Sequence, residues 1–269
     1  MMASILDRDR WQPSPGLPPT GGECHLWLAD LARADGALLA DGTAESVLDA
    51  AERQSLLRFR VESARRVFTA SRTLQRRIAA HYTGSQPRDV VIDRVCEHCG
   101  GDHGKPRVPG SRIDYSVSHS GDLLVVAVVG AGRVGVDVEH VRQRVADLDD
   151  LARTVFAPAE LTSYQALASA DRPSCFYRAW TRKEAVVKLT GYGLRQSLSS
   201  VDVTADLLPS GTVPAGSGAA KTSVEYGIYL RDLPGRDDYP AALASTTRID
   251  TVRHVVPGTA ATPAGPAAN

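Results

Sequence analysis

The chain has 269 residues, enough for one large domain or two modest ones with a sizeable core. Lysine plus arginine number 31, as do aspartate plus glutamate, so the formal net charge is zero. This balance argues against nucleic acid or an anionic membrane as the partner. No apolar run reaches the ~20 residues of a membrane span, and the first residues lack the apolar core of a signal peptide. Four cysteines are too few for a disulfide scaffold, which favours a reducing, cytoplasmic setting.

Apolar periodicity and turn residues predict an α+β fold with a mainly antiparallel sheet. An irregular lead-in, a glycine-rich loop at 100–110, a loop at 209–220 and a disordered tail from 257 complete the expected organisation. The predicted helices, in chain order, lie at 43–57, 62–82, 147–155, 158–169 and 174–190. The predicted strands lie at 25–29, 90–92, 115–129, 133–139, 223–230, 241–245 and 251–256. The strands at 115–129 and 133–139 are expected to be neighbours joined by a turn at 130–132.

Two acidic side chains lie on one predicted strand, in the Gly-Val-Asp-Val-Glu stretch at 135–139. Residues i and i+2 of a strand share a face, so Asp137 and Glu139 point the same way while Val136 and Val138 point into the core. Taken alone, such a pair is typical of a solvated strand end.

A second polar pattern lies on the helix predicted at 174–190. Trp180, Glu184 and Lys188 are spaced at i, i+4 and i+8 and therefore form one stripe. By itself, Glu184 with Lys188 is the favoured helical ion pair, worth about 0.3–0.5 kcal/mol. If it meets Asp137 and Glu139, Glu184 completes a set of three carboxylates. Such a set is typical of a magnesium site that holds phosphates, and not of a thiol or imidazole site.

These patterns resemble the two-part signature of the Sfp-type 4′-phosphopantetheinyl transferases, in which the 135–139 stretch is followed by Trp-x-x-Lys-Glu-Ala-x-x-Lys at 180–188. Gly-Lys-Pro at 104–106 and Ser-Val-Ser-His-Ser-Gly at 116–121 resemble the coenzyme A contacts of that family. Phe-Ala-Pro-Ala-Glu at 156–160 resembles its Phe-x-x-x-Glu stretch. The matches are in order and extend from about residue 58 to residue 194.

The resemblance implies two similar α+β halves related by a pseudo-twofold axis, with coenzyme A in the cleft between them. The halves would be residues 1–132 and 133–256, with the metal site in the second, and 257–269 would be a disordered tail. It implies an enzyme of the holo-acyl-carrier-protein synthase type. This enzyme moves the 4′-phosphopantetheine arm of coenzyme A to a serine of apo acyl or peptidyl carrier proteins and releases 3′,5′-ADP. Carriers of polyketide, nonribosomal-peptide or fatty-acid synthases are the expected partners, and the two-half design suggests a monomer.

The resemblance also implies a catalytic site. Mg²⁺, or Mn²⁺ in its place, would be held by Asp137, Glu139 and Glu184 and would grip the pyrophosphate. Glu184 would also be the general base toward the carrier serine, either directly or through a metal-bound water. Lys188 would stabilise a phosphate oxygen or protonate the leaving group.

A wider set of residues is implied in coenzyme binding, with His119 contacting the 3′-phosphate. Lys183 is equally open to interpretation as a solvated lysine, and the arginines as a basic face toward acidic carriers. The implied coenzyme-binding residues are Arg58, Arg66, Arg76, Lys105, Pro106, Ser118, His119, Asp137, Lys183 and Lys188.

The segment Cys96-Glu-His-Cys99 with His103 has two interpretations. Cys-x-x-Cys is a common zinc half-site, for which His103 or His98 offers a third ligand, whereas Cys24 or Cys175 offers a fourth only by distant folding. The alternative is a cysteine-bearing β-loop beside the coenzyme.

Two other functions stay open. One is a non-catalytic module that docks carriers or coenzyme A, against which the intact carboxylate set argues. The other is a zinc-dependent adaptor built on Cys96 and Cys99, against which the zero net charge and the lack of a second cysteine pair argue.

Overall fold

The computed structural model describes residues 16–32, 43–141, 148–193, 196–203, 221–223 and 227–255. The predicted loop at 209–220 and tail from 257 lie outside these residues, as does most of the lead-in. The helices are α1 (Thr43–Ser46), α2 (Ala50–Leu56), α3 (Glu62–Thr83), η2 (Pro87–Asp89), α4 (Leu148–Val155), α5 (Pro158–Gln165), α6 (Arg172–Thr190) and η4 (Leu198–Ser200). The strands are β1 (Glu23–Asp30), β2 (Asp93–Val95), β3 (Asp102–Arg107), β4 (Asp114–Ser120), β5 (Leu123–Val129), β6 (Val134–Val138), β7 (Lys221–Ser223), β8 (Ile228–Leu233), β9 (Ala241–Ser245) and β10 (Thr251–His254).

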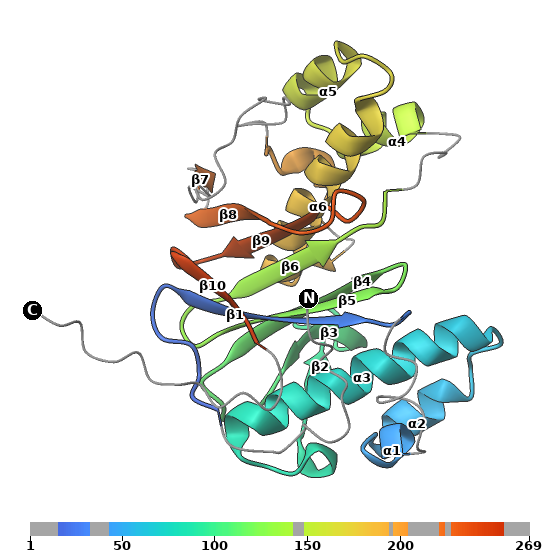
Figure 1. The fold of residues 1–269 in the computed structure, drawn as a ribbon, viewed down its shortest axis with the longest axis vertical. Helices are drawn as coiled ribbons and strands as arrows, with labels where there is room; N and C mark the ends of the chain where they lie inside the picture. The colour runs from blue at the N-terminus through green and yellow to red at the C-terminus, as the bar shows by residue number, and fades with distance from the viewer. Residues whose placement is uncertain are drawn as a thin grey trace, which may run out of the picture.

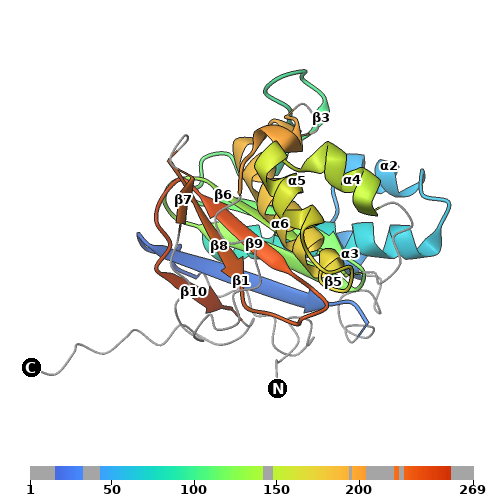
Figure 2. The ribbon, with the colours of Figure 1, turned by 90° about the horizontal axis from the view of Figure 1, so that it is seen from above.

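Two four-stranded sheets are stacked between helices (Figures 1 and 2). The first sheet has the strand order β10-β1-β5-β4 and the second has the order β6-β9-β8-β7. Most strand pairs are antiparallel, which confirms the predicted α+β class. A separate two-stranded hairpin of β2 and β3 makes no backbone strand pairing with either sheet.

Three apolar clusters define the layers. Trp27, Leu74 and Val126 belong to the cluster between α3 and the outer face of the first sheet. The middle cluster lies between the two sheets and includes Val136 and Val138, as the strand alternation predicted, together with Val134. The third lies between the second sheet and α6, with α4 and α5 packed on it. Each sheet therefore has one long helix on its outer face.

Glycine and capping residues determine several helix and strand boundaries that the apolar periodicity of the sequence did not predict. The helix predicted at 43–57 is two helices, because Asp49 caps a new start with Glu52 in a capping box. The strand predicted at 115–129 is the hairpin of β4 and β5, which turns at Gly121 with φ of 54°. Gly191 follows the last residue of α6 in the left-handed conformation and caps the helix.

Other strand predictions were wrong. The predicted strand at 90–92 is replaced by β2, three residues later, and the predicted loop at 100–110 contains β3. The predicted strand at 223–230 is two antiparallel strands, β7 and β8. The strands β5 and β6, predicted as neighbours joined by a turn, belong to different sheets. The turn at 130–132 therefore carries the chain from one sheet to the other.

The last strand returns to the first sheet. β10 pairs in parallel with β1, where Glu23 lies opposite Thr251. The predicted boundary between residues 132 and 133 stays a prediction, and the second half of the chain supplies one strand to the sheet of the first. Within the described ranges, no helix combines the length and the apolar character needed to cross a bilayer.

Candidate active site

A glycine brings β6 against α6. A Cβ atom at Gly135 would lie 1.9 Å from the Ala185 carbonyl oxygen and 2.6 Å from the Leu189 nitrogen, both backbone atoms of α6. Only glycine fits such a close approach. Because residues 135 and 137 share a strand face, the same approach turns Asp137 toward α6.

A ladder of side chains joins the two sheets at their facing edges. β4 and β6 are both edge strands, and no backbone ladder connects them. Instead, every second side chain of β4 accepts a hydrogen bond from every second backbone N–H group of β6. The series continues to His140, just beyond the end of β6. The donor and acceptor pairs are Val134 to Asp114 (2.7 Å), Val136 to Ser116 (3.1 Å), Val138 to Ser118 (3.4 Å) and His140 to Ser120 (3.0 Å). We call Ser116, Ser118 and Ser120 the serine ladder; it satisfies N–H groups that an edge strand otherwise leaves unpaired.

The serine ladder is expected to contribute to stability, and Ser116 tests this without touching the carboxylates. Ser116→Ala leaves the buried Val136 N–H without its acceptor, so the free energy of unfolding should fall by about 1–3 kcal/mol. Urea denaturation measures this change. Ser163→Ala is the matched control, because its exposed hydroxyl only donates to a carbonyl of its own helix. Equal stability of the two variants would contradict the role of the ladder.

Asp137 is the most buried acid of the site. Its Oδ1 accepts from the Ser118 hydroxyl (2.7 Å) and from Lys188 Nζ (2.6 Å), and Lys188 Nζ also reaches Ser118 Oγ (2.8 Å). Its Oδ2 is buried and has no hydrogen-bond partner among the described residues. Burial raises the pKa of Asp137, and the bond to Lys188 opposes that rise. Oδ2 is thus a desolvated carboxylate oxygen without a hydrogen-bond donor among the described residues.

Glu139 lies two residues further along, directly after the end of β6. Its Oε2 accepts from the Ser120 hydroxyl at 2.7 Å, and its carboxylate also accepts from the Trp180 side chain. Burial raises the pKa of Glu139, while the Ser120 bond lowers it. The serine ladder therefore orients both acids, Ser118 holding Asp137 and Ser120 holding Glu139.

Glu184 completes the set from α6. Burial raises its pKa, the negative charges of Asp137 and Glu139 raise it further, and Lys188 lowers it. These mutual effects place the three carboxylates in one electrostatic environment. Their oxygens do not all come within 4.8 Å of one another, since the cysteine–histidine group at 96–103 is the one described cluster that does so. The helical stripe behaves as its spacing predicted: Trp180 contacts Glu139, and Lys188 contacts Asp137.

Two predicted coenzyme contacts are structural residues. Lys183 is fully buried, its Nζ lies 2.6 Å from Glu160 Oε2, and it donates to the carbonyls of Leu198 and Val201. Arg76 is 1% exposed and bonds to Asp49 and Glu52. Neither can touch a ligand in this structure, so both predictions were wrong. Periodicity did not reveal which face of each helix lies inward.

The remaining predicted coenzyme contacts are scattered, and the Lys105 side chain is only 4% exposed. His119 lies at the end of β4 and is partly accessible to solvent; partial desolvation of its ring and the charge of Lys188 lower its pKa. The Lys105 ammonium pairs with Asp114, and Pro106 follows it in β3. Arg66 donates to the Leu31 carbonyl at 2.7 Å. Arg58 is exposed beyond the end of α2. Coenzyme binding by these residues stays a prediction.

Ser116, Ser120 and Trp180 lie in the recognised motifs but were given no role of their own; in the structure Ser120 and Trp180 hold Glu139, and Ser116 supports β6. Serines at i, i+2 and i+4 of a strand share one face, and this spacing was the available signal.

Comparison with known proteins connects this geometry to a family. Residues 133–244 match the model of the 4′-phosphopantetheinyl transferase superfamily, and residues 42–130 match that of the 4′-phosphopantetheinyl transferase N-terminal region. The two matches lie on either side of the turn between the sheets. The second sheet, except for the last residue of β9, and α6 lie within the first match, whereas the second match contains α3, β4 and β5 but neither β1 nor β10.

Individual relatives agree with the family models. The 4′-phosphopantetheinyl transferase HetI of Nostoc sp. is 32% identical over 189 residues, which cover 68% of this chain and 76% of the relative. AcpT of Salmonella typhimurium is 38% identical over 111 residues, 41% of this chain and 55% of the relative. A 4′-phosphopantetheinyl transferase of Bacillus subtilis is 32% identical over 103 residues, 38% of this chain and 44% of the relative. The chain therefore belongs to the 4′-phosphopantetheinyl transferase family, whose enzymes use coenzyme A to transfer phosphopantetheine to carrier proteins.

Proposed function

We propose that this chain performs the transfer at the site formed by Asp137, Glu139, Glu184 and Lys188, with a bound Mg²⁺. The observation that carries the proposal is the unpartnered Oδ2 of Asp137. A buried carboxylate oxygen without a donor is costly, and a cation or a donor from the substrate relieves that cost.

The donor set fits a hard divalent cation. Asp137, Glu139 and Glu184 offer only oxygen atoms, and Mg²⁺ is usually held by one or two carboxylates together with substrate phosphates. Lys188 already neutralises one Asp137 oxygen, so the cation would take the other. When bound, Mg²⁺ would neutralise the charge of the pyrophosphate that develops on the leaving group.

Glu184 is the proposed general base. Burial and the nearby negative charges of Asp137 and Glu139 raise its pKa, so its carboxylate is a stronger base than that of an exposed glutamate. It would accept the proton of the carrier serine as that oxygen attacks the phosphorus bearing the pantetheine. The bond from this phosphorus to the bridging oxygen then breaks, and 3′,5′-ADP leaves.

Lys188 is proposed to meet the phosphates of the coenzyme. Its side chain is 30% exposed, so a ligand can reach the ammonium that contacts Asp137. Ser118 and His119 lie beside it, and the proposed contact of His119 is the 3′-phosphate. In phosphoryl transfer, positioning the pyrophosphate in line with the attacking serine and stabilising its charge account for most of the rate enhancement.

The proposed acceptors are apo acyl or peptidyl carrier proteins of polyketide, nonribosomal-peptide or fatty-acid synthases, met by a monomer in the cytoplasm. The four cysteines are all free thiols, which supports a reducing compartment. Mass spectrometry of carriers incubated with the protein, coenzyme A and Mg²⁺ tests the proposal. Each accepted carrier should gain one phosphopantetheine, and no gain across carriers of all three synthase classes would refute it.

Magnesium is expected to stabilise the protein in a pH-dependent way. Burial raises the pKa of all three carboxylates above their unfolded values of about 4. Without metal, the stability that comes from their protonation is present at low pH and is lost as pH rises through the folded pKa values. Mg²⁺ competes with those protons, so its stabilising effect should be larger at about pH 8 than at about pH 5.

Thermal unfolding with and without Mg²⁺ at both pH values measures this effect. Asp137→Asn is the control, because it removes a titrating ligand and keeps the side-chain shape. An equal Mg²⁺ effect at both pH values, or an unchanged effect in Asp137→Asn, would contradict a cation at these carboxylates.

A further inference from the structure

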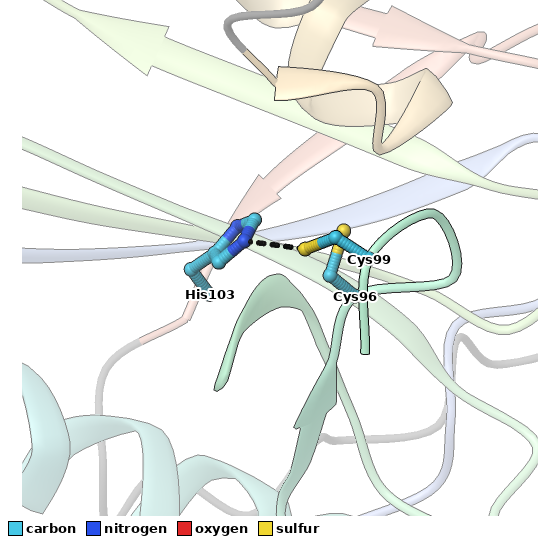
Figure 3. Close-up of side chains that lie close together, drawn as sticks. All are labelled: Cys96, Cys99 and His103. Atoms are coloured by element: carbon cyan, nitrogen blue, oxygen red, sulfur yellow. Dashed lines mark hydrogen bonds between the residues drawn. The ribbon is translucent and has the colours of Figure 1, made fainter. Parts of the chain in front are cut away.

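A second group of metal-binding side chains lies on the β2–β3 hairpin, apart from the carboxylates. Cys96, Cys99 and His103 each place one ligand atom within 4.8 Å of the others. Figure 3 shows the two sulfurs and the imidazole gathered at one point, with Cys99 Sγ 2.9 Å from His103 Nε2. Two thiols and an imidazole are soft and borderline donors, unlike the oxygen set of the active site.

The backbone is built to bring the two sulfurs together. The Cys96 N–H donates to the Gly101 carbonyl at 2.8 Å, and the Gly100 N–H donates to the Cys96 carbonyl at 2.9 Å. Gly100 has φ of 72°, a conformation that residues with a Cβ rarely adopt. These bonds close a tight turn around both cysteines, so their convergence is fixed by the main chain.

A second glycine brings the histidine to the same point. A Cβ atom at Gly104 would lie 2.7 Å from the Val95 carbonyl oxygen and 2.8 Å from Cys96 Cα. The start of β3 therefore presses directly on the residue that carries the first sulfur, and His103 precedes this contact by one position. A disulfide would need only the two cysteines, whereas this arrangement also positions the imidazole.

We propose that Cys96, Cys99 and His103 bind one Zn²⁺ ion, with water or a small ligand in the fourth position. Zinc prefers four-coordinate sites of cysteine and histidine, and three protein ligands leave one position open. Cys99 and His103 are exposed, so this open position faces solvent. The site is a separate feature from the carboxylates and does not depend on the proposed transfer function.

The consequence of zinc would be to fix the loop that joins β2 and β3. The backbone of this hairpin pairs with neither large sheet, and its ties to the rest of the fold are side-chain contacts such as that of Lys105 with Asp114. Its tip nevertheless reaches the other half: His98, between the two cysteines, stacks on Tyr192 with ring centroids 4.5 Å apart. Tyr192 directly follows the Gly191 cap of α6, the helix that carries Glu184 and Lys188. Zinc would thus fix a contact between the halves.

Metal analysis of the full chain, purified under reducing conditions and supplied with Zn²⁺, tests the proposal. Wild-type protein should retain about one zinc per chain after gel filtration, and Cys99→Ser and His103→Asn should each lose roughly nine-tenths of it. Both residues are exposed, so these variants should fold. Cys175→Ala is the matched control: Cys175 is 6% exposed, as is Cys96, lies outside the cluster, and its loss should leave the zinc content unchanged.

Cobalt(II) provides an independent measurement. The wild-type complex should show thiolate-to-cobalt charge-transfer absorption and the intense visible bands of tetrahedral Co²⁺, and Cys99→Ser should weaken the first. Zinc below one-tenth per chain in the wild type, or equal zinc in Cys99→Ser, would overturn the proposal, as would a Cys96–Cys99 disulfide that persists under the reductant. Glu184→Gln should keep its zinc, so failure of the transfer proposal and failure of this one are distinguishable.

Discussion

Glu184→Gln is expected to lower kcat/KM for phosphopantetheine transfer by about 10²–10³-fold or more, with little change in stability. The amide keeps the shape of the side chain but cannot accept the serine proton and is a poor ligand for Mg²⁺. Asp137→Ala should have a comparable effect, because it removes the unpartnered oxygen and the partner of Lys188. Initial rates on an accepted carrier, together with thermal unfolding, measure both effects.

Glu62→Gln is the matched control for these variants. Glu62 is an exposed glutamate in the first turn of α3, so its neutralisation should leave the transfer rate unchanged. Full activity of either Glu184→Gln or Asp137→Ala would refute the assignment of the site. Glu184→Gln is the more informative of the two variants, because Glu184 is half-buried and the substitution keeps the shape of its side chain, so the protein should stay folded.

Gly135→Ala is expected to lower the free energy of unfolding by about 3 kcal/mol, the upper part of the range for an overpacked core. Its methyl group would meet the Ala185 carbonyl at 1.9 Å, and neither backbone can yield without moving β6 away from α6. For a chain of this size the melting temperature should fall by roughly 6–12 °C. Transfer should fall with it, because Asp137 and Lys188 lie on the two elements that separate.

Gly21→Ala controls for the loss of a glycine. Nothing lies within 4 Å of a Cβ atom at Gly21, so the melting temperature should stay close to that of the wild type. Differential scanning calorimetry compares the two variants. Equal melting temperatures would show that β6 and α6 tolerate a methyl group between them, and that the close approach does not position the acids.

Much of the carboxylate arrangement follows from local spacing. A period of two places Asp137 and Glu139 together, and a period of 3.6 places Trp180, Glu184 and Lys188 together. Both periods are properties of single elements, so the sequence reveals them. That the two elements meet depended on the family resemblance, and the structure supplies its physical cause in Gly135.

The failures have a different origin. Lys183 lies directly before Glu184 in the signature stretch. Neighbouring residues of a helix are rotated by about 100°, so Lys183 faces the core while Glu184 faces the site. Its partner Glu160 lies in another helix, so the buried ion pair is a tertiary fact that no local pattern contains. Arg76 fails for the same reason, with partners on α2. The serine ladder joins strands of different sheets and is visible only after both are placed.

The parallel pairing of β10 with β1 has a consequence for biosynthesis. Glu23, near the beginning of the chain, finds Thr251 as its neighbour only after the second sheet's strands have left the ribosome. Until then a nascent first half presents the open edge of β1, a surface that invites pairing with other chains. β10 therefore covers the edge of β1 only late in synthesis. On ribosomes stalled before residue 251, the first half of the chain should be cut by proteases more readily than in the released protein.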